Sequence, residues 1–215
     1  MSRELQLGIK RVGDIVVAAI GVVLLLPAFI LIGIAIKFDS AGPVFFKQRR
    51  VGRFGKPFRM LKFRTMIAGA ADLGAGVYVC AKDPRVTRVG KVLRRYSLDE
   101  LPQLIHVLAG EMSLVGPRPG LPYQRKFYSE HHVRRLLARP GITGWSQVSG
   151  RNLISWPERL EKDVWYVGHW SLGLDLRILL RTALVCWSGE GLYGARENFF
   201  FTGCDDLPVP REDYD

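Results

Sequence analysis

One uncharged apolar run, residues 15–36, constrains this chain more than any other feature of its sequence. As a helix rising about 1.5 Å per residue it would be roughly 33 Å long, and the hydrocarbon core of a bilayer is about 30 Å thick. A secretory signal has a shorter apolar core and a small-residue cleavage site, and neither feature is evident here. The run therefore predicts that the chain is attached to a membrane.

The residues around this run bear on how it sits in the membrane. Lys10 and Arg11 precede it, and residues 37–64 after it are rich in Lys and Arg. Since these residues favour the cytoplasmic side, a re-entrant helix-hairpin keeps both flanks there, whereas a crossing helix does not. Pro27 lacks a backbone donor and predicts a break within the run. The hairpin is favoured, a kinked spanning helix stays open, and Asp14 can pair with Lys10 one turn away.

The balance of charge predicts an anionic partner. The chain has 215 residues, a formal net charge of +11 and a pI of about 9.9. Such a charge suits nucleic acid, acidic lipid headgroups or a phosphorylated substrate. The basic residues cluster beside the apolar run and no nucleic-acid-binding motif is present, so we expect anionic membrane lipid and no nucleic acid. The cysteines are few and unevenly spaced, which is typical of reduced thiols in the cytoplasm.

The chain divides into a membrane anchor, residues 1–37, one domain over residues 38–188, and a tail, 189–215, to which no role is assigned. Residues 174–187 carry two arginines on one face, so this segment is either an amphipathic helix in the membrane interface or a packed core helix. The patterns predict an α+β, mostly helical fold, with strands at 44–48 and 58–63, a turn at 51–57, a loop or weak helix at 68–83, helices at 91–95, 98–108, 123–139 and 157–167, and irregular chain at 116–122.

The run at residues 94–104 has two interpretations. In the structural one, Ser97 and Glu100 form a capping box that opens a helix, and Asp99 complements the helix dipole. In the functional one, the helix N-terminus and Arg94 bind phosphate, and Asp99 stays ionised and attacks phosphorus beside a Mg²⁺ ion that screens the charges. The run by itself favours the structural interpretation, in which the buried face consists of Leu98, Leu101, Leu104 and Ile105.

Other basic residues shift that balance. Arg118 lies between two prolines that stiffen its backbone, so it is either a preorganised contact to phosphate or uracil, or an exposed loop residue. Lys62 and Arg64 alternate with an aromatic residue in a predicted strand and share one face of it. Arg151 follows a glycine in what is at least a tight turn. A non-catalytic basic protein that binds anionic lipid is the alternative to an enzyme at this point.

Taken in order, these runs resemble the bacterial sugar transferases, the monotopic phosphoglycosyl transferases. One membrane segment precedes the domain, as in the small, minimal type, and residues 151–156 are similar to the members that begin bacterial N-linked glycan assembly. The resemblance extends from about residue 10 to residue 184, and the motifs that carry it are Lys10-Arg11-x-x-Asp14 and residues 62–66, 97–104, 112–119 and 140–145.

The resemblance implies a two-step reaction at the cytoplasmic face of the bacterial inner membrane. Asp99 would attack the β-phosphorus of a UDP-sugar, expel UMP and hold the phosphosugar, which polyprenyl (undecaprenyl) phosphate would then accept. Glu100 would act with Asp99, which would also be the ligand of Mg²⁺. The sugar implied is an N-acetylated or diacetylated amino sugar, while glucose, galactose and related donors stay open. The sequence gives no oligomeric state. The residues expected to bind substrate are Arg94, Arg118, Arg151, Lys62 and Arg64, and those expected to form the re-entrant anchor are Lys10, Arg11, Asp14 and Pro27.

Overall fold

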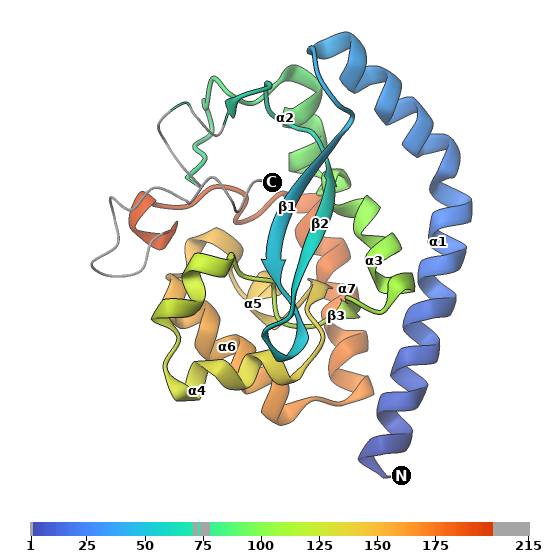
Figure 1. Ribbon diagram of the computed structural model, residues 1–215, viewed down its shortest axis with the longest axis vertical. Coiled ribbons are helices and arrows are strands. Elements are labelled where there is room, and N and C mark those ends of the chain that lie inside the picture. Colours follow the sequence, from blue (N-terminus) through green and yellow to red (C-terminus); the bar gives the residue numbers. More distant parts are fainter. Residues whose placement is uncertain (1, 71–72, 74–77, 200–215) are drawn as a thin grey trace.

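The computed structural model describes residues 2–70, 73 and 78–199. Its longest element is α1, Arg3–Asp39, which runs along one edge of the molecule and curves over its end (Figure 1). The Ser2 hydroxyl caps it by accepting from the backbone N–H of Leu5. The helix is long and apolar enough to cross a membrane by length and composition.

Pro27 lies inside α1 and does not interrupt it. The break predicted there is wrong, because α1 continues through the proline. The re-entrant course of this segment in the membrane stays a prediction. Residues on both sides of the proline explain the continuity, because Val22 and Leu25 pack against one core cluster of the domain, and Phe29 and Ile32 pack against the next. Packing on both sides keeps the turns aligned although the proline donates no hydrogen bond.

Opposite faces of α1 meet different surroundings. Asp14, Ala18 and Ile36 are buried against the domain. The other face is apolar and exposed among the described residues, which is unusual for a helix of a soluble domain. Its exposed members include Val12, Val16, Ile20, Val23, Leu24, Ile30, Leu31 and Ile34.

The sheet structure is small. Strands β1, Phe45–Val51, and β2, Pro57–Phe63, were both predicted, and in the structure they pair as an antiparallel hairpin, with Phe45 opposite Phe63. Strands β3, Ser113–Val115, and β4, Gly141–Thr143, pair in parallel and were not predicted, because each is only three residues long and lies beside glycine and proline.

Two predicted helices are divided. Residues 98–108 form a 3₁₀ segment, η3 (Leu98–Gln103), followed by α3 (Leu104–Ala109), because Pro102 cannot donate to the carbonyl four residues earlier. Residues 123–139 contain three short pieces, because Tyr128 is extended. The remaining helical segments are η1 (Arg53–Gly55), α2 (Arg88–Arg95), η4 (Pro122–Phe127), α4 (Glu130–Val133), η5 (Arg134–Leu137), α5 (Trp145–Val148), η6 (Arg151–Leu153), α6 (Trp156–His169), α7 (Leu172–Ser188) and η7 (Arg196–Phe199).

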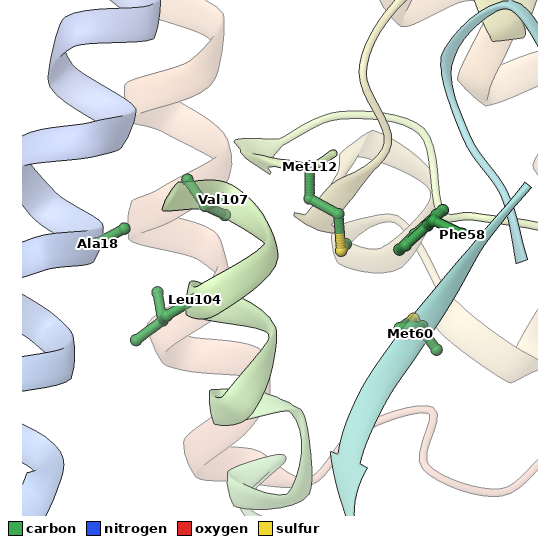
Figure 2. Packing of buried hydrophobic residues seen from close by; sticks show 6 residues of the cluster. All are labelled: Ala18, Phe58, Met60, Leu104, Val107 and Met112. Carbon is green, nitrogen blue, oxygen red and sulfur yellow. The ribbon is translucent and has the colours of Figure 1, made fainter. Parts of the chain in front are cut away.

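One core cluster joins α1 to the domain. Figure 2 shows Ala18 of α1 facing Leu104 and Val107 of α3, with β2 on the far side of that helix. Ile105 of the same helix is exposed, so its predicted place in the buried face is wrong. The buried members of this cluster are Ala18, Phe58, Met60, Leu104, Val107 and Met112.

The structure confirms that α7 packs against the domain, and its place in the membrane interface stays a prediction. Asp175 and Ile178 are buried, and the Arg181 guanidinium lies 5.5 Å from the centre of the Trp145 ring, so one face packs against the domain. Its other face is apolar and exposed at Leu176, Leu180, Leu184 and Trp187.

Candidate functional site

A cavity of about 730 Å³ opens between the β1–β2 hairpin, η3 and the helices α5 and α6. This volume lies within the range of about 300–1,000 Å³ that is usual for small-molecule sites. Its lining is strongly basic, with Arg50, Lys62, Arg64, Arg85, Arg94, Arg118, Arg135, Arg151 and Arg159 around three carboxylates, Asp99, Glu100 and Asp163.

Asp99 and Glu100 begin η3, but the capping box predicted there is wrong. Ser97 has a left-handed backbone (φ 57°) and its side chain makes no cap hydrogen bond. Its hydroxyl instead accepts from Nη2 of Arg151 at 2.9 Å. The Glu100 carboxylate is turned to cations of other elements, so it cannot reach back to the backbone of Ser97.

Glu100 is held by two cations. Nζ of Lys62 donates to Oε1 at 2.7 Å, and Arg118 donates to Oε1 at 2.7 Å and to Oε2 at 3.3 Å. Burial by itself would raise the pKa of Glu100, but Arg118 and Lys62 hold this pKa well below its ordinary value. Glu100 is therefore an ionised anchor that fixes both cations in the cavity.

Asp99 differs from its neighbour in its hydrogen bonds and in the direction of its pKa shift. Within the described part of the chain its carboxylate makes no hydrogen bond or ion pair, although it lines the cavity. Burial raises the pKa of Asp99, Lys62 opposes this rise, and Glu100 adds to it. Burial therefore works against the charge on Asp99, while Lys62 favours it. The ionised state of Asp99 stays a prediction. The result is a desolvated carboxylate with both oxygens available.

Arg94 and Arg151 flank this carboxylate from different elements. Arg94 is in the last turn of α2, and its Nε is buried with no partner among the described residues. Arg151 has a left-handed backbone (φ 51°), and burial, followed by the charge of Arg118, lowers its pKa. The structure thus brings both arginines, with Arg118, to the cavity of Asp99, and their contact with substrate stays a prediction.

Arg64 lines the same cavity, but its guanidinium has a structural task. It donates to the carbonyl of Ala41 at 2.6 Å and to the carbonyl of Ser40 at 2.7 Å, just beyond the end of α1. These bonds satisfy backbone acceptors where the helix ends. Contact of Arg64 with substrate stays a prediction.

The basic motif at the start of α1 docks the helix onto the domain. Lys10 lies 3.9 Å from Asp14, as predicted, but its closer partner is Asp175 of α7, at 2.6 Å. Asp14 accepts from the hydroxyl of Ser113 at 2.7 Å, and Arg11 donates to the carbonyl of Val107 at 2.8 Å.

Sequence reasoning missed a buried ion pair in the wall of the cavity. Arg135 donates through Nε to Asp163 at 3.1 Å, through Nη1 to the Tyr128 hydroxyl at 2.8 Å, and through Nη2 to the backbone carbonyl of Arg118. The other oxygen of Asp163 accepts from Ser146 at 2.8 Å. The one signal in the sequence was an acid on the apolar stripe of a helix, since Asp163 lies among buried residues of α6.

The described residues contain no group of three or more His, Cys, Asp or Glu side chains that could hold a metal ion. Mg²⁺ is commonly bound by one or two carboxylates together with water and substrate phosphates. A lone free carboxylate, Asp99, in a cavity lined by arginines fits that mode and does not fit a metal cage made of protein alone.

Comparison with known proteins shows the family of this chain. The family model of the bacterial sugar transferases matches residues 5–189. The uncharacterized sugar transferase EpsL of Bacillus subtilis (strain 168) is 45% identical over 185 residues, which cover 86% of this chain and 90% of that protein. The exopolysaccharide production protein ExoY of Rhizobium meliloti (strain 1021) is 40% identical over 198 residues, covering 86% and 88%.

A third relative carries a more specific name. The UDP-glucose:undecaprenyl-phosphate glucose-1-phosphate transferase of Xanthomonas campestris pv. campestris is 42% identical over 184 residues, which cover 81% of this chain but 38% of that longer protein. The matches extend from α1 through α7 and include every motif on which the resemblance rested. The chain belongs to the bacterial sugar transferase family, and it is an enzyme of that family.

Proposed function

We propose that this protein transfers a phosphosugar from a UDP-sugar to undecaprenyl phosphate, by way of a covalent intermediate on Asp99. The observation that carries the proposal is the contrast within the acidic pair. Glu100 is neutralised by Lys62 and Arg118, while Asp99 is free and faces a basic cavity. The relatives named as UDP-glucose:undecaprenyl-phosphate glucose-1-phosphate transferases support the substrate classes.

In the first step an oxygen of Asp99 bonds to the β-phosphorus of the donor, and the bond from that phosphorus to the bridging oxygen breaks. UMP leaves with the electron pair, and the sugar phosphate stays on Asp99 as an acyl phosphate. In the second step a phosphate oxygen of the lipid attacks the same phosphorus and releases the carboxylate. Polyprenyl-diphosphate-sugar is formed, and the two steps together need no net proton.

The surrounding cations supply the electrostatics of this transfer. Arg94, with its unpartnered Nε, and Arg118 are placed to bind phosphate oxygens, since guanidinium groups recognise phosphate bidentately. Arg151 approaches from the other side of Ser97. We propose Asp99 as the protein ligand of a Mg²⁺ ion that, when bound, would neutralise charge on the donor diphosphate.

We place the protein in the bacterial cytoplasmic membrane, with α1 re-entrant and the domain on the cytoplasmic face. Both ends of α1 are tied to the same domain, through Lys10 to Asp175 and through the Asp39 carboxylate, which accepts from the N–H of Val89 at 2.8 Å. A helix standing across the bilayer would draw that domain into the hydrocarbon, where its polar groups would lose their water. Attachment from one side avoids this cost.

The identity of the sugar is a separate part of the proposal. Residues 151–156 favour an N-acetylated or diacetylated amino sugar, whereas the names of the relatives mention glucose and, for an Erwinia amylovora protein, galactose. A panel of UDP-glucose, UDP-galactose, UDP-N-acetylglucosamine and a UDP-diacetylated amino sugar decides between them. The preferred donor should give the highest rate of UMP release with undecaprenyl phosphate.

Intact-protein mass spectrometry tests the intermediate. Protein incubated with the preferred donor, Mg²⁺ and no lipid should gain the mass of one phosphosugar and release one equivalent of UMP. Asp99→Asn should do neither, while Glu158→Gln, an exposed carboxylate-to-amide control outside the cavity, should behave as wild type. Product formed from the lipid acceptor by Asp99→Asn would refute the covalent role. If the wild type releases no UMP from any donor but still binds vesicles of anionic lipid, the result would favour a non-catalytic lipid-binding protein instead.

A further inference from the structure

The chain continues past the residues that the family model matches and returns to the cavity. The match ends at residue 189, where α7 has just ended. From there the described segment, residues 189–199, runs away from α1 to the opposite edge of the molecule (Figure 1). Within it, the side chain of Leu192 lines the cavity. We call residues 189–198 the C-terminal strap.

The strap is hydrogen-bonded to the loop that carries Arg151. The backbone N–H of Asn152 donates to the carbonyl of Gly191 at 3.2 Å, and its side-chain amide donates to the carbonyl of Leu192 at 2.8 Å. Nη1 of Arg151 donates to the carbonyl of Glu190 at 3.4 Å. Three successive strap residues therefore accept hydrogen bonds from two neighbouring loop residues.

Asn198 makes the second attachment of the strap. Its side-chain amide donates to the carbonyls of Asn152 and Leu153, at 3.1 and 3.0 Å. Its own carbonyl accepts from Nη2 of Arg159, a cavity residue of α6, at 3.0 Å. One asparagine thus joins the strap to the loop and to the cavity wall.

Two glycines allow this close approach. A Cβ on Gly194 would lie 1.8 Å from the carbonyl oxygen of Asn152, where no atom fits. A Cβ on Gly191 would lie 2.7 Å from the carbonyl oxygen of Gly150, and Gly191 also has a positive φ of 66°. The strap therefore contacts the loop backbone to backbone, and a methyl group at either glycine would push them apart.

The loop held in this way carries a strained residue into the site. Arg151 has φ 51°, and its partner Ser97, two residues before Asp99, has φ 57°. Non-glycine residues adopt this conformation at a cost and keep it only where the surroundings enforce it. The strap supplies such surroundings for Arg151.

We propose that the C-terminal strap is a positioning element that holds Arg151 and Asn152 in the binding site for the nucleotide-sugar donor. This inference rests on the proposed function. The strap runs to the edge of the molecule opposite α1 (Figure 1). Since α1 is the proposed membrane attachment, the lipid acceptor would come from the side of α1, so we assign the strap to the soluble substrate. The strap sets the affinity for the donor and leaves the lipid site unchanged.

Steady-state kinetics of the full chain test this assignment. UMP release is measured with varied UDP-glucose, or a better donor from the panel, at saturating undecaprenyl phosphate, and then with the two substrates exchanged. Asn198→Ala and Gly194→Ala should raise the KM for the donor about tenfold, the effect of losing about two net hydrogen bonds. Neither variant should change the KM for the lipid, and kcat should change less than twofold.

A matched glycine substitution is the control. Gly168→Ala in α6 places a methyl group where no atom lies within 4 Å, so it should leave both KM values unchanged. If both strap variants have the donor KM of Gly168→Ala, or if the lipid KM rises as much as the donor KM, the strap does not position the donor site. A wild type that releases no UMP would instead refute the proposed function, so the two failures are distinguishable.

Discussion

The ion pair of Arg135 and Asp163 gives the most informative prediction about this protein. The Arg135 and Asp163 side chains are 1% and 2% exposed, and Asp163→Asn would leave the guanidinium buried without its counter-ion. Breaking such a pair on one side costs about 3–5 kcal/mol. In a protein of this size that corresponds to a Tm lower by about 6–20 °C. Thermal unfolding of detergent-solubilised protein, followed by intrinsic fluorescence, measures the change.

The double variant Arg135→Met, Asp163→Leu separates charge from packing. Burial raises the pKa of Asp163, although Arg135 acts to lower it. Burial acts to lower the pKa of Arg135, but Tyr128 and Asp163 outweigh this effect, so the pKa of Arg135 is raised. Burying the pair therefore costs free energy, but removing one of its two charges costs more. Replacing both members by apolar groups of similar volume is often neutral, so the double variant should recover at least half of the lost Tm.

Activity should not recover with stability. The double variant lacks the donor that Arg135 offers to the backbone carbonyl of Arg118, so Arg118 loses its support and UMP release should stay at least tenfold below wild type. The reasoning is refuted if Asp163→Asn lowers the Tm by less than about 2 °C, or if the double variant is less stable than Asp163→Asn. Full activity in the double variant would show that Arg135 is not needed to position Arg118.

Three further predictions concern Asp99 and the anchor. Because burial raises the pKa of Asp99, the wild type should lose stability as the pH rises through that pKa. Asp99→Asn cannot ionise, so in the thermal unfolding assay it should have a higher Tm than the wild type at pH 7. UMP release should rise over the same pH interval, as the carboxylate ionises. Lys62→Met removes the largest influence that lowers the pKa of Asp99, so the acid limb of the pH–rate profile should move to higher pH. An acid limb that does not move would contradict the assignment of this limb to Asp99. In Pro27→Ala, a cysteine introduced as Ser2→Cys should still be labelled from the side of the membrane on which the domain lies. The reason is that packing on both sides of Pro27, and not the proline itself, sets the course of α1. Labelling from the opposite side of the membrane would contradict this conclusion.

Local patterns predicted most of the regular elements. The alternating residues of 58–63 gave β2 to within one residue, and the apolar run gave the helix that became α1. The predictions failed where the deciding contact was distant. The cap expected at Ser97 is absent, because Arg151 takes the hydroxyl and because Lys62 and Arg118 take the Glu100 carboxylate.

In the candidate site, too, local motifs identified residues but did not show their contacts. The motifs pointed to Asp99, Glu100, Arg94 and Arg118, and the cavity contains all four. They did not show that the pKa values of these two acids shift in opposite directions. Asp163, 64 positions after Asp99 in this numbering, also lines the cavity, and no motif named it.

The sequence by itself determined the apolar helix, the order of the family's motifs and therefore the kind of chemistry. Helix and strand periodicity act over a few residues, so a pattern of side chains is enough to specify them. The tertiary structure decided which charges are paired, because Lys62 and Glu100 are 38 residues apart and Arg118 is 18 residues from Glu100. Coulomb energies and desolvation depend on distances that only folding creates. For that reason Glu100 became the anchor of two cations, while the Asp99 carboxylate has no hydrogen-bond partner among the described residues.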